Sequence, residues 1–306
     1  MRLTPFRLHR PTTIEAASEL LDELGGDALL YCGGTELLLV AKLGLTDFTD
    51  LVDVKAIEEL AGIQVGPPSR GTGPPSRGTG GELRIGASTT HREIEHSAAV
   101  RERWPSLAAM ERGVGNLRVR NVGTIGGNLC FADPHSDPAT YLIAAAGAVS
   151  ARAGGAPERR IEAEEFVVGP YETALAEGEL LTAVHVPACT PGSALVHRKM
   201  SFHERPAITV AANVTVREGV AVEARVAVGS VGVTPKRARD AERALIGLEA
   251  LAPRREQLEA CGDAAAQEAE PVADANGSVE YKRQLVRVLT ARCASAALAA
   301  ALADAR

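Results

Sequence analysis

Aromatic side chains and basic clusters are what this 306-residue sequence most lacks. Phe, Trp and Tyr make up only 3% of the residues, so the core must be built from Leu, Val, Ile and Ala. Lys and Arg number 33 against 39 Asp and Glu, which gives a net charge of -6. Because neutralising phosphates requires a clustered basic surface, this balance argues against a nucleic-acid partner. The charged fraction of 24% is typical of an ordinary globular protein.

Long apolar runs and closely spaced cysteines are also missing. No stretch approaches the roughly 18 to 20 apolar residues that cross a bilayer, and residues 293–305 are Ala-rich but shorter. We expect those residues to form a terminal helix with a buried face. The five cysteines are far apart, unlike the ligands of structural zinc or iron–sulfur clusters. We expect no signal peptide, no membrane span, no metal site, and a cytoplasmic protein with free thiols.

Residues 12–54 have the pattern of a small α/β lobe. Residues 12–24 have helical spacing after Pro11 and a Thr cap, and "DALLYC" is a short apolar run typical of a buried strand. "ELLLVAKLG" predicts a second helix and "TDLVDV" a second strand. The order helix, strand, helix, strand predicts parallel pairing.

The sequence pattern changes after Leu60. "AGIQVG" and "ELRIGAS" predict a hairpin, and between them "GPPSRGT" is written twice. Such Pro-, Gly- and Ser-rich sequence buries little apolar surface, so we expect residues 66–81 to form a flexible insertion. Helical patterns follow, and residues 137–153 read as a helix running into a strand.

The last third predicts a separate α+β unit. "ELLTAVHVP" reads as a strand ended by Pro187, and three further strands are expected between residues 194 and 231. Three helical patterns close the chain.

Two glycine pairs stand in positions suited to a ligand. Thirty glycines predict about three adjacent pairs by chance, and the sequence has five, so a pair alone means little. Gly33–Gly34, however, separates a predicted buried strand from a helix, and Gly126–Gly127 lies in "GTIGGN". Glycine lets a ligand approach the backbone or permits positive φ, and a helix start offers unpaired amides. Together the two loops could grip a diphosphate; a tight turn remains the alternative for each.

Other chemistry is weakly supported. The stretch from Cys130 to Asp137 also contains Asp133 and His135, but prolines interrupt it and its spacing fits no metal site. Cys130 is better explained as a partly buried structural thiol than as a nucleophile. The remaining histidines considered lack a matching set of partners and are expected at the surface or behind a site; they are His91, His96, His197 and His203. The residues alone therefore predict a multi-lobed α/β protein that binds a diphosphate-bearing cofactor.

Both glycine loops, in this order, resemble a known family. "LYCGGTEL" and "TIGGN" resemble the two FAD-binding loops of the flavoprotein subunit of molybdenum hydroxylases, which include aerobic carbon monoxide dehydrogenase and xanthine dehydrogenase. "FRLHRPTTIEAASELL", "LRIGASTTHREIE" and "GSVGVTPKRARDAERAL" resemble further segments of that family, so the likeness covers nearly the whole chain.

The resemblance implies an α+β fold in two domains. Residues 1–175 would form a two-lobed FAD-binding domain of the vanillyl-alcohol-oxidase-like (PCMH) type, with lobes at about 1–56 and 57–175. Residues 176–306 would form a C-terminal domain of the carbon monoxide dehydrogenase flavoprotein type, with a three-stranded antiparallel sheet and helices.

The resemblance also implies a set of cofactor-binding residues and no catalytic residue. Asp137 matches a family Asp nine residues after the Asn, Leu181 a Leu whose backbone meets the flavin, and Lys199 a Lys near the flavin. Val114 stands where some relatives place a Phe over the flavin. The remaining positions lie on the two loops: Leu30, Tyr31, Cys32, Gly33, Gly34, Thr35, Glu36, Leu37, Thr124, Ile125, Gly126, Gly127 and Asn128.

By the same resemblance, the chain would be an electron-transfer subunit holding FAD non-covalently. A large molybdopterin subunit and a small subunit with [2Fe-2S] clusters would be its partners, in a dimer of heterotrimers. Electrons would pass from the clusters through FAD to an acceptor such as NAD, a quinone or oxygen. "MSFHERPAI" after Lys199 lacks the Arg–Arg and acidic residues that help xanthine dehydrogenase hold NAD. The alternatives are a stand-alone flavin oxidase and a flavin-free assembly module of the same fold.

Overall fold

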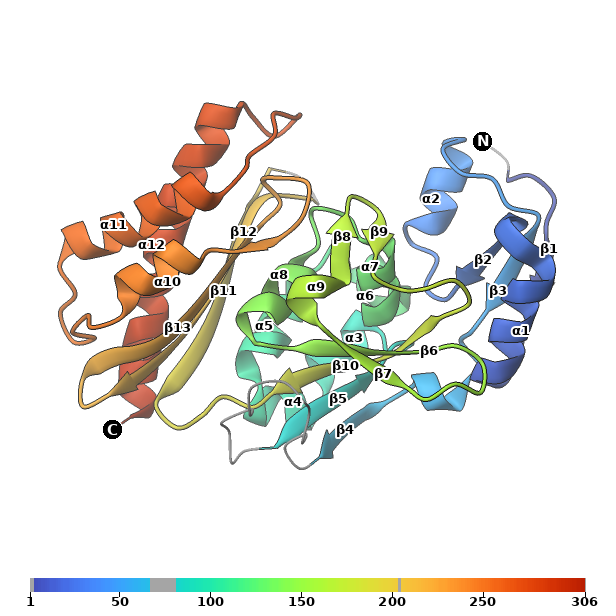
Figure 1. Cartoon of the computed structure of the whole chain (residues 1–306), viewed down its shortest axis with the longest axis horizontal. Coiled ribbons are helices and arrows are strands. Elements are labelled where there is room, and N and C mark those ends of the chain that lie inside the picture. Colours follow the sequence, from blue (N-terminus) through green and yellow to red (C-terminus); the bar gives the residue numbers. More distant parts are fainter. Residues whose placement is uncertain (1–2, 67–80, 203–204, 306) are drawn as a thin grey trace.

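A small parallel sheet forms the first lobe, at the right of Figure 1. The computed structural model describes residues 3–66, 81–202 and 205–305. Strands β1 (Arg7–His9), β2 (Ala28–Tyr31) and β3 (Asp50–Asp53) pair in the order β1-β3-β2, and both pairings are parallel. Helices α1 (Ile14–Leu24) and α2 (Leu37–Lys42) connect them, with a 3-10 turn at Gly25–Asp27. The Thr13 hydroxyl accepts from the amide of Ala16 at the start of α1, as the sequence predicts.

A five-stranded antiparallel sheet forms the second lobe. Its order is β4 (Ile63–Gly66), β5 (Glu82–Gly86), β10 (Leu180–Pro187), β6 (Ala148–Arg152) and β7 (Arg159–Glu162). The predicted β4–β5 hairpin is present. The duplicated segment within it, residues 67–80, lies outside the described residues.

Short helices accompany this sheet. They are α3 (His91–His96), α4 (Ala98–Arg103), α5 (Pro105–Arg112), α6 (Leu117–Val122), α7 (Ile125–Phe131), α8 (Asp137–Ala144) and α9 (Ala163–Phe166). A 3-10 turn at Glu58–Leu60 precedes β4, and a small hairpin of β8 (Val167–Gly169) and β9 (Glu172–Thr173) follows α9.

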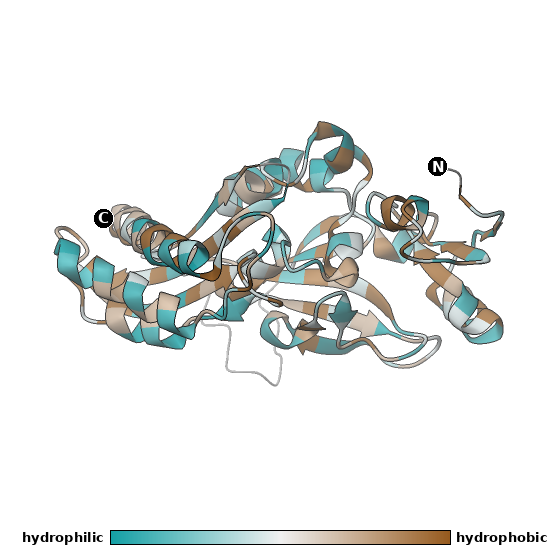
Figure 2. Cartoon of the chain, turned by 90° about the horizontal axis from the view of Figure 1, so that it is seen from above, coloured by the Kyte–Doolittle hydropathy of each residue, from teal (hydrophilic) through white to brown (hydrophobic). Residues whose placement is uncertain are grey.

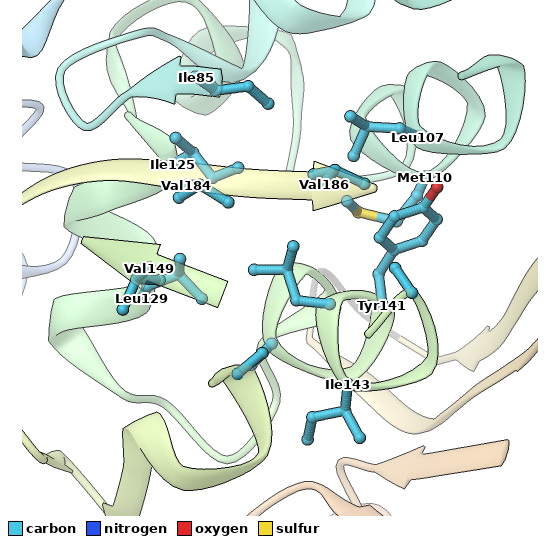
Figure 3. Packing of buried hydrophobic residues seen from close by; sticks show 14 of the residues in the cluster. Ile85, Leu107, Met110, Ile125, Leu129, Tyr141, Ile143, Val149, Val184 and Val186 are labelled. Atoms are coloured by element: carbon cyan, nitrogen blue, oxygen red, sulfur yellow. The ribbon is translucent and has the colours of Figure 1, made fainter. Parts of the chain in front are cut away.

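The central strand β10 organises the largest core. Figure 3 shows Val184 and Val186 of this strand among side chains from the flanking strands and helices, such as Ile85 and Ile125. Trp104, the sole Trp, is buried there and its indole N–H donates to the carbonyl of Pro187 at 3.1 Å. The sequence placed the domain boundary at 175/176, before this strand. In the structure, β10 is hydrogen-bonded to β5 and β6 of the second lobe, so this strand is part of that lobe's sheet.

The C-terminal domain is an antiparallel sheet covered by helices. It contains β11 (Ser193–Ser201), β12 (Pro206–Arg217), β13 (Val220–Gly229) and β14 (Lys236–Arg237), then α10 (Arg239–Leu245), α11 (Arg255–Glu268) and α12 (Val279–Asp304). The three long strands match the expected sheet; the two-residue β14 adds a fourth that the sequence did not predict. In Figure 2 the outer helices alternate hydrophilic and hydrophobic residues along their length.

Helix α12 has the buried face expected for the chain's terminal helix. Cys293, Ala297 and Ala301 are buried in it, and it packs on β11, β12 and α11. By length and composition alone this helix could cross a membrane, which the sequence analysis did not anticipate. Such a helix is weak evidence of a span, because core helices pass the same test.

Candidate functional site

A cleft of about 440 Å³ lies where the two glycine loops meet, and the C-terminal domain contributes residues such as Arg205 to its lining. Fifteen of the seventeen residues expected from the resemblance line it: Leu30, Tyr31, Cys32, Gly33, Gly34, Thr35, Glu36, Leu37, Val114, Thr124, Gly126, Gly127, Asn128, Asp137 and Leu181. Ile125 and Lys199 are not among its lining residues. The chain therefore brings together segments more than a hundred residues apart.

The first loop follows β2 and requires glycine at both positions. Gly34 has φ of 68°, and a Cβ there would collide with the ring of Tyr31. A Cβ on Gly33 would meet the carbonyl of Val122 and lie 2.8 Å from the Cα of Gly123. The two loops can therefore approach each other only because these residues lack side chains.

Backbone amides differ between the two loops. Among the described residues, no hydrogen bond is found from the amides of Gly34, Thr35 and Glu36, and all three residues line the cleft. Unpaired backbone N–H groups are costly unless water or a ligand satisfies them. This loop therefore offers donors to an anionic ligand.

The second loop is hydrogen-bonded within the chain. The amides of Ile125 and Gly126 donate to the carbonyls of Thr89 and Ala87, and that of Gly127 donates to the Thr124 hydroxyl at 3.1 Å. The expectation that this loop wraps a diphosphate with its amides therefore needs correction. It also leaves space: apart from its chain neighbours and its own helix backbone, the Thr124 hydroxyl, at 2.9 Å, is the one atom of the described residues within 4 Å of a Cβ built on Gly127.

Asp137 brings a buried carboxylate to the cleft. Lys199 donates from Nζ to Asp137 Oδ2 at 2.6 Å and to the carbonyl of Gly113 at 2.6 Å. Asp137 Oδ1 is buried without a hydrogen-bond partner in the described part of the chain, and His197 Nε2 lies 3.6 Å away. Burial raises the pKa of the Asp137 carboxyl against the opposing charge of Lys199. An unpaired acceptor of this kind is suited to a ligand hydroxyl.

The neighbouring charges modify two expectations. Lys199 was expected near the flavin, and its ammonium group is paired with Asp137. Burial, and then the charge of Lys199, lower the pKa of His197 to about 3, so this ring is neutral. His197 therefore lies behind the site, as the sequence suggested.

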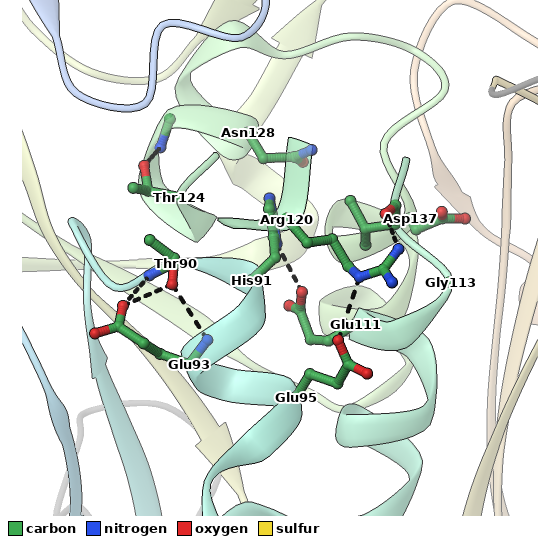
Figure 4. Close-up of polar contacts among 12 residues, drawn as sticks. Thr90, His91, Glu93, Glu95, Glu111, Gly113, Arg120, Thr124, Asn128 and Asp137 are labelled. Carbon is green, nitrogen blue, oxygen red and sulfur yellow. Dashed lines mark hydrogen bonds and ion pairs between the residues drawn. The ribbon is translucent and has the colours of Figure 1, made fainter. Parts of the chain in front are cut away.

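The sequence analysis did not place two residues at the cleft, Arg205 and His91. Arg205 is the sole Lys or Arg among the described residues lining it, and its guanidinium contacts Glu36 at 3.0 Å and Asp133 at 2.8 Å. His91 is buried rather than at the surface, and its Nδ1 lies 2.6 Å from Glu111 Oε2 (Figure 4). No sequence signal marks Arg205, because its partners lie on distant segments. The Thr90–Glu93 capping box places His91 at the first position of α3.

The metal and nucleophile alternatives receive no support. His135 pairs with Asp133 at 2.9 Å, and no cluster of three metal-ligating side chains occurs in the described ranges. Cys32 and Cys130 both line the cleft. Burial raises the pKa of the Cys32 thiol, which disfavours the reactive thiolate.

Family comparisons cover nearly the whole chain. Residues 4–189 match the FAD binding domain in molybdopterin dehydrogenase, and residues 199–297 match the CO dehydrogenase flavoprotein C-terminal domain. The carbon monoxide dehydrogenase medium chain of Hydrogenophaga pseudoflava is 31% identical over 297 residues, covering 96% of this chain and 97% of the relative. The nicotine 6-hydroxylase medium subunit of Paenarthrobacter nicotinovorans is also 31% identical, covering 95% and 97%.

Solved structures agree with these matches. Carbon monoxide dehydrogenase from Hydrogenophaga pseudoflava has a TM-score of 0.88 at 30% identity, covering 98% of this chain and 99% of the other. Quinoline 2-oxidoreductase from Pseudomonas putida 86 has a TM-score of 0.86 at 25% identity, covering 99% and 100%. Both compared chains are thus similar in fold over almost their full length.

Proposed function

Because this chain belongs to the family of FAD-binding subunits of molybdenum hydroxylases, we propose that it is the electron-transfer subunit of such a complex. Electrons would arrive from the [2Fe-2S] clusters of a small partner and leave to an external acceptor such as NAD, a quinone or oxygen. A large partner would hold molybdopterin and choose the substrate. A dimer of heterotrimers and a cytoplasmic location complete this proposal.

The residues of the cleft fit FAD. The unpaired amides of Gly34 and Thr35 suit a diphosphate, and Gly127 leaves space opposite them. The unpartnered Oδ1 of Asp137 suits a hydroxyl of the cofactor. When bound, FAD supplies the capacity to accept electrons singly and to release them in pairs.

The single observation that carries the proposal is that the two glycine loops contact each other at the cleft. Gly33 lies against Gly123 so closely that no side chain fits between them, and both loops line one cleft. The buried, unpartnered acceptor at the same cleft argues against the flavin-free assembly module. Whether the isolated chain oxidises a substrate by itself distinguishes the stand-alone oxidase from the electron-transfer subunit.

An absorption spectrum of the purified full chain tests the proposal. We expect bound FAD, and we expect acid or heat denaturation to release all of the yellow colour, because burial raises the pKa of the Cys32 thiol in the first loop and disfavours the thiolate that a covalent link would need. A colourless, folded chain that takes up no added FAD would exclude this function. Colour retained on the precipitated polypeptide would contradict the non-covalent link.

A further inference from the structure

A histidine and a glutamate form a buried pair at the cleft. His91 Nδ1 lies 2.6 Å from Glu111 Oε2, with side chains 2% and 0% exposed. The second oxygen of Glu111 has no hydrogen-bond partner within the described residues. A buried carboxylate without a compensating partner is strongly destabilising, so the imidazole is the group that makes Glu111 tolerable here.

The pair reaches the cleft through the histidine ring. His91 lines the cleft, and its amide donates to the carbonyl of Gly123 at 3.1 Å. A Cβ built on Gly123 would lie 3.4 Å from His91 Cδ2 and 3.4 Å from Thr35 Oγ1, so the ring stands where the two loops meet. Figure 4 shows His91 between Glu111 and the segment that carries Thr124 and Asn128.

The number of protons on the pair decides whether Nε2, the ring nitrogen of His91 that does not contact Glu111, is a hydrogen-bond donor or an acceptor. With one proton, Nδ1–H donates to the ionised Glu111 and Nε2 of His91 can only accept. With two protons, Nε2 carries a hydrogen and can only donate, and the pair is electrically neutral overall. An anionic ligand oxygen is compatible only with the second state.

Other charged groups around the pair are already matched. Asp137, which interacts electrostatically with both members of the pair, is bound to Lys199. Arg120 on α6 pairs with Glu95 at 3.2 Å. Tyr141 on α8 interacts with Glu111, and burial raises the pKa of its hydroxyl, so it stays neutral. Within the described residues, Asp137 and Glu111 are thus the carboxylates at this junction that keep an unpartnered buried oxygen, and His91 contacts only Glu111 of the two.

We propose that His91 and Glu111 form a proton-coupled contact for the diphosphate of FAD: binding draws one proton onto the pair, and His91 Nε2–H donates to a diphosphate oxygen. This rests on the proposed function, since it needs FAD in this cleft. FAD affinity then falls as pH rises, by up to about tenfold per pH unit where the free pair has lost its second proton and the bound pair keeps it. His91 is a binding residue in this role, and Glu111 positions it.

Calorimetric titration of the flavin-stripped full chain with FAD measures the proton directly. Titrations near neutral pH, in buffers of different ionisation enthalpy, give the number of protons taken up. We expect uptake approaching one proton for the unmodified chain and none for His91→Gln, whose amide donates but does not titrate. His96→Gln is the matched control, because it makes the same change at an exposed histidine of the same helix and should leave the uptake unchanged.

A second variant covers the case in which His91→Gln does not fold. Glu111→Gln removes the carboxylate that stabilises the imidazolium, so the pH of half-maximal uptake should fall. Failure of the unmodified chain to bind FAD would contradict the proposed function itself. Tight FAD binding without proton uptake, or uptake that persists in folded His91→Gln or is unshifted in folded Glu111→Gln, would overturn this inference alone.

Discussion

At the scale of single residues, four glycines in the cleft are required for different reasons. Only Gly34 has a left-handed backbone. Gly33 and Gly126 are needed because the backbone of another segment lies where their Cβ atoms would be. Gly123 occupies that space beside Gly33, and Ala87 occupies it beside Gly126. Gly127 lies in α7 and faces the cleft, so its requirement would come from the ligand. The sequence could identify the two pairs but could not assign these reasons.

Gly33→Ala tests the contact between the loops. Its methyl group would overlap the backbone of Val122 and Gly123, and we expect a loss of about 1–3 kcal/mol of unfolding free energy together with most of the bound flavin. Gly26→Ala is the control, because no atom lies within 4 Å of a Cβ at that position. Thermal unfolding and flavin content are measured for both variants. If Gly33→Ala matched Gly26→Ala in both, the close contact between the loops would not be needed for stability or for flavin binding.

Gly127→Val tests the space offered to the ligand. Because this glycine is helical, valine meets no left-handed strain here, contrary to what glycine at such a loop suggests. The nearest atom to the new Cβ is the Thr124 hydroxyl at 2.9 Å, which can shift slightly. We expect the fold to survive and FAD to bind at least about tenfold more weakly, a cost of about 1.4 kcal/mol. Flavin retained at wild-type affinity would place the diphosphate elsewhere.

Residues that act through long-range partners were the least predictable. Asp137 was found only because the family resemblance marked it. Arg205 and the His91–Glu111 pair carry no local pattern, since their partners are brought near by the fold. Ile125 was expected in the site as part of a contiguous motif, but its side chain is buried under the loop.

At the scale of elements, length and amphipathic pattern decided what could be predicted. The helices of the first lobe and the three long C-terminal strands follow from periodicity. The strands β1 and β14 have three and two residues and are mostly exposed, so they lack a readable alternation. β10 was recognised as a strand, but only pairing with β5 and β6 assigns it to the second lobe.

Glu82 on β5 predicts a pH dependence for this sheet. Burial opposes ionisation, but His185 on β10 and Arg160 on β7 outweigh it and lower the pKa of Glu82 from 4.5 to about 2. A depressed carboxyl pKa stabilises the fold above about pH 4.5, and that contribution is lost as pH falls through about 2. We expect Glu82→Gln to cost about 1–2 kcal/mol at neutral pH, after discounting for partial solvent screening, and progressively less toward pH 2.

Denaturant unfolding across this pH range measures the Glu82 contribution. Glu165→Gln, on an exposed carboxyl of the neighbouring α9, serves as the control and should show no such convergence with the unmodified chain. A stability difference for Glu82→Gln that stayed constant down to pH 2 would assign its effect to packing instead of charge.

At the scale of the whole molecule, ion pairs tie the three parts together around the cleft. Arg205 of the C-terminal domain contacts Glu36 of the first lobe and Asp133 of the second. Lys199 links β11 to Asp137 at the start of α8. In Figure 1 the second lobe stands between the other two parts, so the cleft depends on all three. The cleft is therefore formed only by the assembled chain, so the separate sequence motifs could indicate it but could not show how its walls come together.

The assembled chain should nevertheless be unable to oxidise a substrate alone. On the proposed function, the cleft holds FAD, and the molybdenum and iron–sulfur chemistry belongs to the partner subunits. We expect purines, N-heterocycles, aldehydes or carbon monoxide to leave the oxidised flavin absorption of the isolated chain unchanged under anaerobic conditions. Adding the molybdopterin and [2Fe-2S] subunits should bleach it with the complex's own substrate. Dithionite, which reduces flavin directly, is the control that the flavin is competent. Bleaching of the isolated chain by one of these substrates would replace the electron-transfer subunit with a stand-alone oxidase.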